Sequence, residues 1–216
     1  MTEREWQDCN DALQMLDYLR QQSASQRKLR LFGCARCRYF WHLFSDERAR
    51  RAIEVSEKYA DDQVTVAELQ AASETIWASG IGQNDLTPSG RVVLGAANER
   101  DPTGEGCWDT AWDCYNGADP EEVAAMDAAT KAEIPLIRDI FGNPFHNQLF
   151  DPSWRTPTAL ALAKEIYEER MFDTIPILAD ALEDAGCDDS NILSHCHNSG
   201  PHVRGCWVVD FLLEKK

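Results

Sequence analysis

The sequence predicts an all-α fold, a compact multi-helix domain with about eight to ten helices. Helix-capping patterns recur along the chain, and the apolar residues behind them repeat at spacings of three and four. No stretch alternates apolar with polar residues over a length typical of strands. No repeat of fixed period is visible, which argues against a solenoid. One helical domain over residues 1–216 is therefore expected.

The first part of the chain carries a series of helix starts. Thr-x-x-Glu, the spacing of a capping box, occurs at residues 2–5 and again at 65–68. Residues 10–11 and 45–47 also supply capping side chains, and apolar residues follow them at helical spacing. Residues 26–44 form the longest uninterrupted helix candidate, rich in Leu, Phe, Trp and Cys and free of proline.

A connection rich in glycine and proline follows at residues 80–106. Its Gly and Pro residues are Gly80, Gly82, Pro88, Gly90, Gly95, Pro102, Gly104 and Gly106. This composition predicts a flexible insertion, broken by a short helix around residues 91–98. Residues 107–115, which include Trp108 and Trp112, are expected to form another short helix.

The second half of the chain returns to helical patterns. Asp119-Pro120 predicts a helix start, because Asp caps the helix and Pro fits its first turn. Pro135 is expected to kink or restart that helix. The run Gly142-Asn143-Pro144-Phe145 predicts a turn with its phenylalanine against the core. The helices expected after this turn span residues 156–170, 174–185, 190–197 and 204–215.

The chain is acidic, with a formal charge of −16 from 37 acidic and 21 basic residues. This charge repels phosphate backbones and anionic membrane surfaces, so we expect neither a nucleic-acid nor a membrane partner. It favours solubility, or association with a basic protein partner. Residues 27–51 differ, because they hold eight basic residues. We expect that basic stretch to pair with acidic helices of the same domain.

The N-terminal residues Met-Thr-Glu-Arg-Glu-Trp lack the apolar run of a secretion signal, and no apolar run approaches eighteen residues. A cytoplasmic location is therefore expected. In a reducing compartment, the eight cysteines are expected as thiols or metal ligands rather than disulfides.

Two long segments carry distinctive motifs. One contains Leu29-Arg-Leu-Phe-Gly-Cys-Ala-Arg-Cys-Arg-Tyr-Phe-Trp-His, and the other ends in His202-Val-Arg-Gly-Cys-Trp-Val-Val-Asp. Together they resemble a family of uncharacterised proteins that occurs in many copies in planctomycete bacteria. The resemblance covers about the first 80 and the last 65 residues. The family's first motif often reads Cys-x-Cys-Cys, whereas Arg36 stands at the third position here. The resemblance implies kinship and no activity.

Cys34 and Cys37 form a Cys-x-x-Cys pair inside a predicted helix. Residues three apart share a helix face, so the two thiolates could supply half of a tetrahedral zinc site. His42 follows five residues after Cys37 and faces about 140° further round the helix. The alternative is that both cysteines are small core residues, because free Cys packs like a small hydrophobe.

A second group of thiols and imidazoles lies near the C-terminus. Its members are His195, Cys196, His197, His202 and Cys206. Neighbouring ligands on a regular helix cannot all face one ion, and the turn at residues 199–201 could bring His202 back beside them. We therefore predict a Cys2His2 zinc site from Cys196, His202, Cys206 and either His195 or His197. A place in the first turn of the last helix would favour a Cys206 thiolate.

The alternative for this C-terminal group is structural. Cys206 and Trp207 would then be core residues, His202 would bond to a helix end, and His197 would face solvent. A catalytic interpretation needs a nucleophile, a base and an orienting group, which Cys206, His202 and Asp210 could provide. A carboxylate beside a thiol disfavours the thiolate, however, and phosphate-binding loops are absent from the sequence. The sequence therefore predicts no catalytic residue.

These patterns favour a non-enzymatic protein-interaction or regulatory module, which would bind a protein partner through residues 80–116. The basis is the long insertion with its two tryptophans, together with the lack of a complete catalytic group. The alternative is a Cys/His zinc-binding protein with a structural or hydrolytic site.

Overall fold

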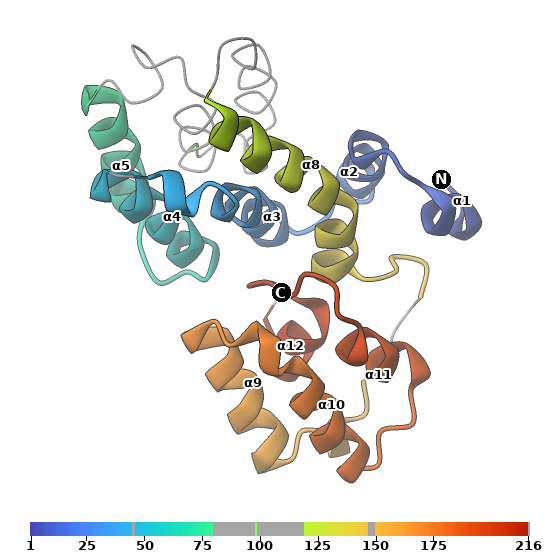
Figure 1. Cartoon of the computed structure of the whole chain (residues 1–216). Helices are drawn as coiled ribbons and strands as arrows, with labels where there is room; N and C mark the ends of the chain where they lie inside the picture. The colour runs from blue at the N-terminus through green and yellow to red at the C-terminus, as the bar shows by residue number, and fades with distance from the viewer. Residues whose placement is uncertain (45, 80–97, 99–118, 147–149, 216) are drawn as a thin grey trace. The chain divides into compact units, whose positions relative to one another are not determined.

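The computed structural model describes residues 1–44, 46–79, 98, 119–146 and 150–215. These residues form ten α-helices and three short 3₁₀-helices, and they contain no strand (Figure 1). The all-α prediction is confirmed. Over the same residues, no helix combines the length and the apolar character needed to cross a membrane.

Contacts between residues group the chain into two compact units. The terminal unit combines Met1–Gln22 with Ile134–Lys216, and the middle unit is Ser23–Glu133. The boundary falls within α8 (Pro120–Phe141), so this helix contributes residues to both units. A single domain over residues 1–216 stays a prediction.

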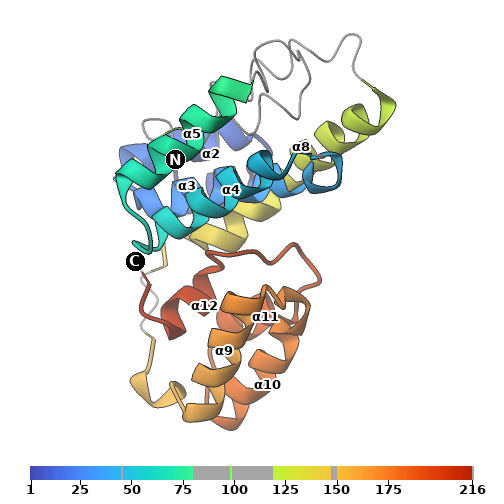
Figure 2. The same cartoon turned by 90° about the vertical axis from the view of Figure 1, so that its left-hand side faces the viewer.

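Helices α3 (Gln26–Arg38), α4 (Glu47–Ala60) and α5 (Val66–Ser79) form the middle unit with the first part of α8. Helix α4 packs against both α3 and α5 (Figure 2). The predicted caps are present, since the Asp46 carboxylate accepts from the Arg48 N–H group. Thr65 and Glu68 bond each other's backbone N–H groups. The core of this unit contains Cys34, Cys37, Phe40, Ile53, Ile76 and Met126.

The helix predicted over residues 26–44 is wrong in its extent, because α3 ends at Arg38. At this point the backbone changes to hydrogen bonds of the 3₁₀ type, between residues three apart. The Phe40 N–H group, for example, lies 3.0 Å from the Cys37 carbonyl oxygen. A short 3₁₀-helix, η1 (Trp41–Leu43), follows. The turn places Phe40 and Phe44 in the apolar core, and this burial outweighs continuing the helix.

The basic stretch forms ion pairs with carboxylates of the middle unit. The pairs are Arg27–Asp61 at 2.9 Å, Arg36–Glu133 at 2.9 Å and Arg38–Glu57 at 2.7 Å. All six side chains of these pairs are at most 21 % exposed. The positive charges of residues 27–38 therefore serve packing within this unit.

In the part of the terminal unit that the structure describes, there are seven α-helical segments, counting the end of α8. Besides α8, they are α1 (Glu3–Asp8), α2 (Ala12–Gln21), α9 (Pro157–Glu169), α10 (Ile175–Asp184), α11 (Ser190–His197) and α12 (Trp207–Leu212). Helix α10 packs against α9 and α11, and α12 packs against α9 (Figures 1 and 2). The apolar core includes Ile166, Leu178, Leu182, Cys196, Cys206 and Trp207.

Two predictions about helices of this unit are corrected. Of the kink or restart expected at Pro135, the restart is wrong, because α8 continues through Pro135 and the residues Leu136, Ile137 and Ile140 behind it are fully buried. A kink at Pro135 stays a prediction. The last helix was expected over residues 204–215 but is limited to α12. Gly205 has a φ of +96°, a conformation incompatible with a right-handed helix, so α12 begins only after it.

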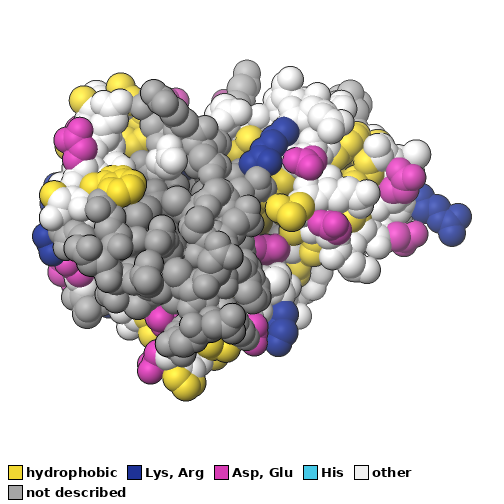
Figure 3. Space-filling view, turned by 90° about the horizontal axis from the view of Figure 1, so that it is seen from above, with side chains coloured by type: hydrophobic (Ala, Val, Ile, Leu, Met, Phe, Trp, Pro, Cys, Tyr) yellow, Lys and Arg dark blue, Asp and Glu magenta, His cyan; other side chains and the backbone are white. Residues whose placement is uncertain are grey.

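The predicted insertion at residues 80–106, apart from Asn98, lies outside the described residues, as do the tryptophans at 108 and 112. On the face shown in Figure 3, described acidic and basic side chains are interspersed with apolar ones.

Candidate metal centre

Four side chains of the terminal unit converge on one point. Asp139, His195, His202 and Cys206 each offer one ligand atom, and these atoms all lie within 4.8 Å of one another. They come from α8, from α11, from the segment after α11 and from the residue that precedes α12. Within the described residues, this is the one group of three or more His, Cys, Asp or Glu side chains with such convergence.

Local backbone features position these residues. Helix α8 ends just after Asp139, because Gly142 has a φ of +65°. A Cβ atom at Gly142 would lie 3.2 Å from Cγ of Trp207, so only glycine allows this close approach. At the other side, the Asp189 carboxylate caps α11 by accepting from the N–H groups of Asn191 and Ile192.

Asp139 is at the centre of the hydrogen-bond network. Its Oδ1 atom lies 2.7 Å from Nδ1 of His202 and 3.2 Å from Nε2 of His195, while Oδ2 accepts from the Val203 N–H group. Burial pushes the pKa of Asp139 upward, but hydrogen bonds and charges from the two histidines outweigh burial and hold it below its usual value. The carboxylate is therefore ionised although it is almost fully buried.

His202 is a hydrogen-bond partner of Asp139. Burial lowers the pKa of His202, but the hydrogen bond and charge of Asp139, with the Asn198 carbonyl, raise it above its usual value. Its Nε2–H group donates to the Asn198 carbonyl oxygen at 3.1 Å. Asn198 is the C-cap residue of α11, so His202 does bond to a helix end. This bond leaves Nδ1 facing the other three side chains.

Cys206 lies in a fully buried position. Burial raises the pKa of its thiol well above the usual value, the charges of Asp139 and Cys196 add to the rise, and the Val209 and Val208 N–H groups oppose it. The expected helix-stabilised thiolate is therefore wrong for the metal-free protein. The residue also precedes α12 rather than lying in its first turn.

The same imidazole nitrogen faces both the thiol and the carboxylate. Nε2 of His195 lies 3.2 Å from Sγ of Cys206 and 3.2 Å from Oδ1 of Asp139. A catalytic triad requires the opposite, one ring nitrogen toward the nucleophile and the other toward the carboxylate. Convergence on a single nitrogen suits a metal ion and does not suit proton relay.

The neighbours of His195 on α11 do not join this group. Cys196 is fully buried in the apolar core, and burial raises its pKa to about 12. His197 is exposed, and its Nδ1 atom lies 2.9 Å from the Leu193 carbonyl oxygen. Of the predicted ligands, the structure therefore brings together His195, His202 and Cys206, and Asp139 takes the fourth place.

Cys34 and Cys37 have different surroundings. Both are buried in the apolar core of the middle unit. Burial raises the pKa of Cys34 to about 12 and that of Cys37 well above its usual value. The side chain of His42 is 55 % exposed and lies 3.8 Å from Glu121. The described surroundings of Cys34 and Cys37 therefore match the alternative that both are small core residues.

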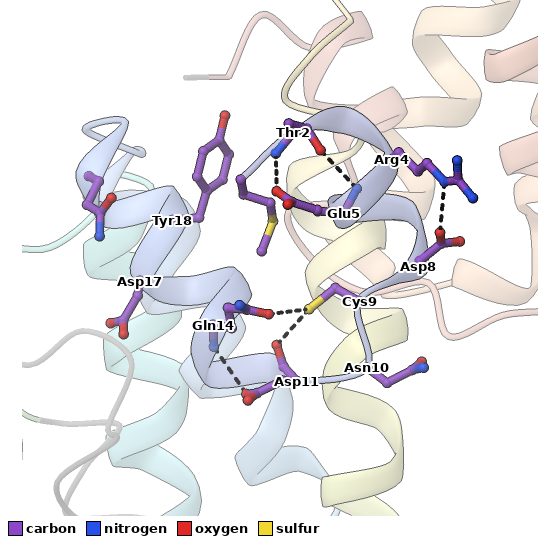
Figure 4. Close-up of a pocket in the computed structure, with 12 residues that line it drawn as sticks. Thr2, Arg4, Glu5, Asp8, Cys9, Asn10, Asp11, Gln14, Asp17 and Tyr18 are labelled. Atoms are coloured by element: carbon purple, nitrogen blue, oxygen red, sulfur yellow. Dashed lines mark hydrogen bonds and ion pairs between the residues drawn. The ribbon is translucent and has the colours of Figure 1, made fainter.

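A cavity of about 1020 Å³ lies between α1 and α2, and none of the four converging residues lines it. Its polar groups bond to one another (Figure 4). The Cys9 thiol, for example, lies 3.3 Å from the side-chain oxygen of Gln14.

Comparison of the chain with protein-family models, curated proteins and solved structures finds no match. Kinship with the planctomycete proteins stays a prediction. The chemistry of the four residues therefore rests on their geometry.

Sequence reasoning missed Asp139. The available signal was a carboxylate among the apolar residues of the second half of α8, beside Leu136 and Ile140. An acidic residue on a buried helix face needs a partner, so its position marks a polar site.

Proposed function

We propose that the protein is a metal-stabilised helical protein that binds one Zn²⁺ ion through Asp139, His195, His202 and Cys206. The observation that carries the proposal is the convergence of four ligand atoms within 4.8 Å. The donor set is two imidazoles, one thiolate and one carboxylate. Zinc, a borderline-soft ion, accepts all three donor types.

The spacing of the donors is compatible with zinc. Tetrahedral bonds of the usual length, near 2.0–2.3 Å, hold ligand atoms about 3–4 Å apart. The observed contacts are 2.7 Å from Asp139 to His202 and 3.2 Å from His195 to both Asp139 and Cys206. Small side-chain movements would open the network enough to hold the ion.

Burial supports a structural role for the metal. The side chains of His195, His202 and Asp139 are 16 %, 7 % and 3 % exposed, and Cys206 is fully buried. Four protein donors fill a tetrahedral site, whereas catalytic zinc keeps one position for water or substrate. The ion would link α8 to α11 and to the start of α12, both of which lie much later in the sequence.

The outer hydrogen bonds also favour a metal. Metal-bound histidine commonly donates its second ring N–H group to a carbonyl or a carboxylate. His202 has this arrangement toward the Asn198 carbonyl oxygen. Oδ2 of Asp139 is fixed by the Val203 N–H group, so Oδ1 is oriented toward the site. Metal would replace the proton between Asp139 and His202.

Metal analysis of protein purified without an affinity tag tests this proposal. We expect about one equivalent of zinc, and loss of zinc in the Cys206→Ala and Asp139→Asn variants. Cys196→Ala is the matched control, because Cys196 is equally buried, lies on the same core and is not one of the four. Less than about a tenth of an equivalent in wild-type protein reconstituted with zinc would contradict the proposal.

The interaction module predicted at residues 80–116 stays a prediction, because apart from Asn98 those residues lie outside the described part of the chain. Pull-down with a chain lacking residues 81–105 tests it, and an unchanged set of partners would contradict it.

A further inference from the structure

A second cavity of the terminal unit, of about 420 Å³, adjoins the metal centre. Its lining includes Asn191, Ser194 and His195, which share one face of α11, and Asn198, the C-cap residue of that helix. Arg138 also lines it, and none of the lining residues is acidic, although the chain holds 37 acidic residues. The volume falls in the range of small-molecule sites, about 300–1,000 Å³.

Of the four ligand residues, His195 alone lines this cavity. It is also the most exposed of them, with 16 % of its side chain accessible against 7 % for His202. A small molecule in the cavity could therefore reach the metal position only from the side of His195.

His195 is also held less firmly than His202. Both ring nitrogens of His202 have hydrogen-bond partners, namely Asp139 and Asn198. For His195, only Nε2 has a hydrogen-bond or ion-pair partner within the described residues, and the ring otherwise packs against those of His202 and Trp207, with centroids 4.9 Å and 5.1 Å away. The imidazole beside the cavity is therefore the one that can leave at the lowest cost.

We infer that this cavity is a ligand-exchange site on the metal, where His195 dissociates and a small neutral molecule with an unprotonated ring nitrogen takes its place. The inference rests on the proposed function. One metal–nitrogen bond breaks and an equivalent one forms, so the exchange needs no oxidant or reductant. Amide and hydroxyl side chains such as Asn191 and Ser194 would bond the polar edge of the incoming molecule.

Rescue by imidazole tests this inference on protein loaded with Co²⁺, whose absorption spectrum reports its ligands. We expect His195→Gly to bind Co²⁺ at least about tenfold more weakly than wild-type, and millimolar imidazole to restore most of that loss. His202→Gly is the matched control, because its position is enclosed, and imidazole should not restore it. Equal restoration in both variants, or none in His195→Gly, would overturn the inference.

A second measurement covers the case in which the glycine variants do not fold. Ser194→Trp should narrow the cavity and slow transfer of Co²⁺ to a chelator about tenfold. Ser190→Trp is the control, on the same helix but outside the cavity. An unchanged transfer rate in Ser194→Trp overturns the exchange route alone. A wild-type protein that binds no Co²⁺ overturns this inference and the proposed function together.

Discussion

The two cysteine-rich regions of this protein have similar compositions and opposite surroundings. Cys34 and Cys37 lie among apolar residues of the middle unit, where the nearby charges belong to ion pairs such as Arg38–Glu57. Cys206 lies beside two imidazoles and a carboxylate. A guanidinium stays protonated and cannot bind a metal, whereas imidazole, thiol and carboxylate all become ligands once deprotonated. The Glu57 carboxylate near Cys34 is paired with Arg38, whereas the imidazoles and the carboxylate around Cys206 converge on one point.

Metal removal should have the largest effect and should act on one region only. A tight ion in about 1,000-fold excess over its Kd stabilises the unit that holds it by about 4 kcal/mol. Hydrogen exchange measured with and without a chelator should show faster exchange in α11 and α12 and little change in α3 and α4. The Cys34→Ala and Cys37→Ala variants should keep their zinc. If the chelator accelerated exchange equally in both regions, the metal would not be bound by the terminal unit alone, and the contrast between the two regions would be wrong.

The ion pairs of the middle unit should give the next largest effect. Glu133→Gln removes a negative charge that pairs with Arg36, whose side chain is 4 % exposed, and we expect a loss of about 3 kcal/mol in the free energy of unfolding. Chemical denaturation measures this change, with the exposed Glu54→Gln as control. Zinc content should not change in either variant. A loss as small as that of the control would show that the pair contributes little.

The helix starts and the site differ in how far they could be predicted. Caps depend on residues two or three apart, so the bonds of Thr2, Asp11 and Thr156 follow from local sequence. The site depends on tertiary convergence, and its fourth member, Asp139, lies on another helix far earlier in the chain. Nothing local in the C-terminal segment indicates that Asp139 faces it.

The end of α3 and the start of α12 were predicted incorrectly, because their causes cannot be seen in a local capping pattern. Helix α3 stops early because Phe40 turns into the core, a matter of tertiary burial. Helix α12 starts late because Gly205 adopts a positive φ. That glycine also sets the direction in which Cys206 leaves the backbone, so the late start is part of how the site is built.

Substitution of Gly205 should have a smaller effect on stability and on zinc affinity, and it acts on the terminal unit. Its φ of +96° suits glycine, so Gly205→Ala should cost about 1–2 kcal/mol and weaken zinc binding about tenfold by moving Cys206. Gly200→Ala is the control, because a Cβ atom there would find its nearest neighbour at 3.9 Å. Competition with a zinc-sensitive dye measures the affinity. If both variants bind zinc equally well, the backbone at Gly205 does not position the ligand.

The smallest expected effect is a pH dependence whose sign differs between the metal-free and zinc-bound protein. The pKa of Asp139 is lowered in the folded state, so its contribution to stability is present above its unfolded pKa, near 3.9, and is lost as pH falls through the folded value. The pKa of His202 is raised, so its contribution is present below about 6.5 and is lost as pH rises through the folded value. The metal-free terminal unit should therefore be most stable between about pH 4 and 6.5.

Zinc binding should show the opposite trend above that range. The ion needs a thiolate and neutral imidazoles, so its affinity rises with pH and the zinc-bound terminal unit gains stability where the metal-free unit loses it. Hydrogen exchange, corrected for its intrinsic pH dependence and measured at several values between about pH 5 and 8, should therefore separate the metal-free from the zinc-bound terminal unit. A metal-free terminal unit that becomes more stable from pH 6 to 8 would remove the Asp139–His202 charge pair from the explanation.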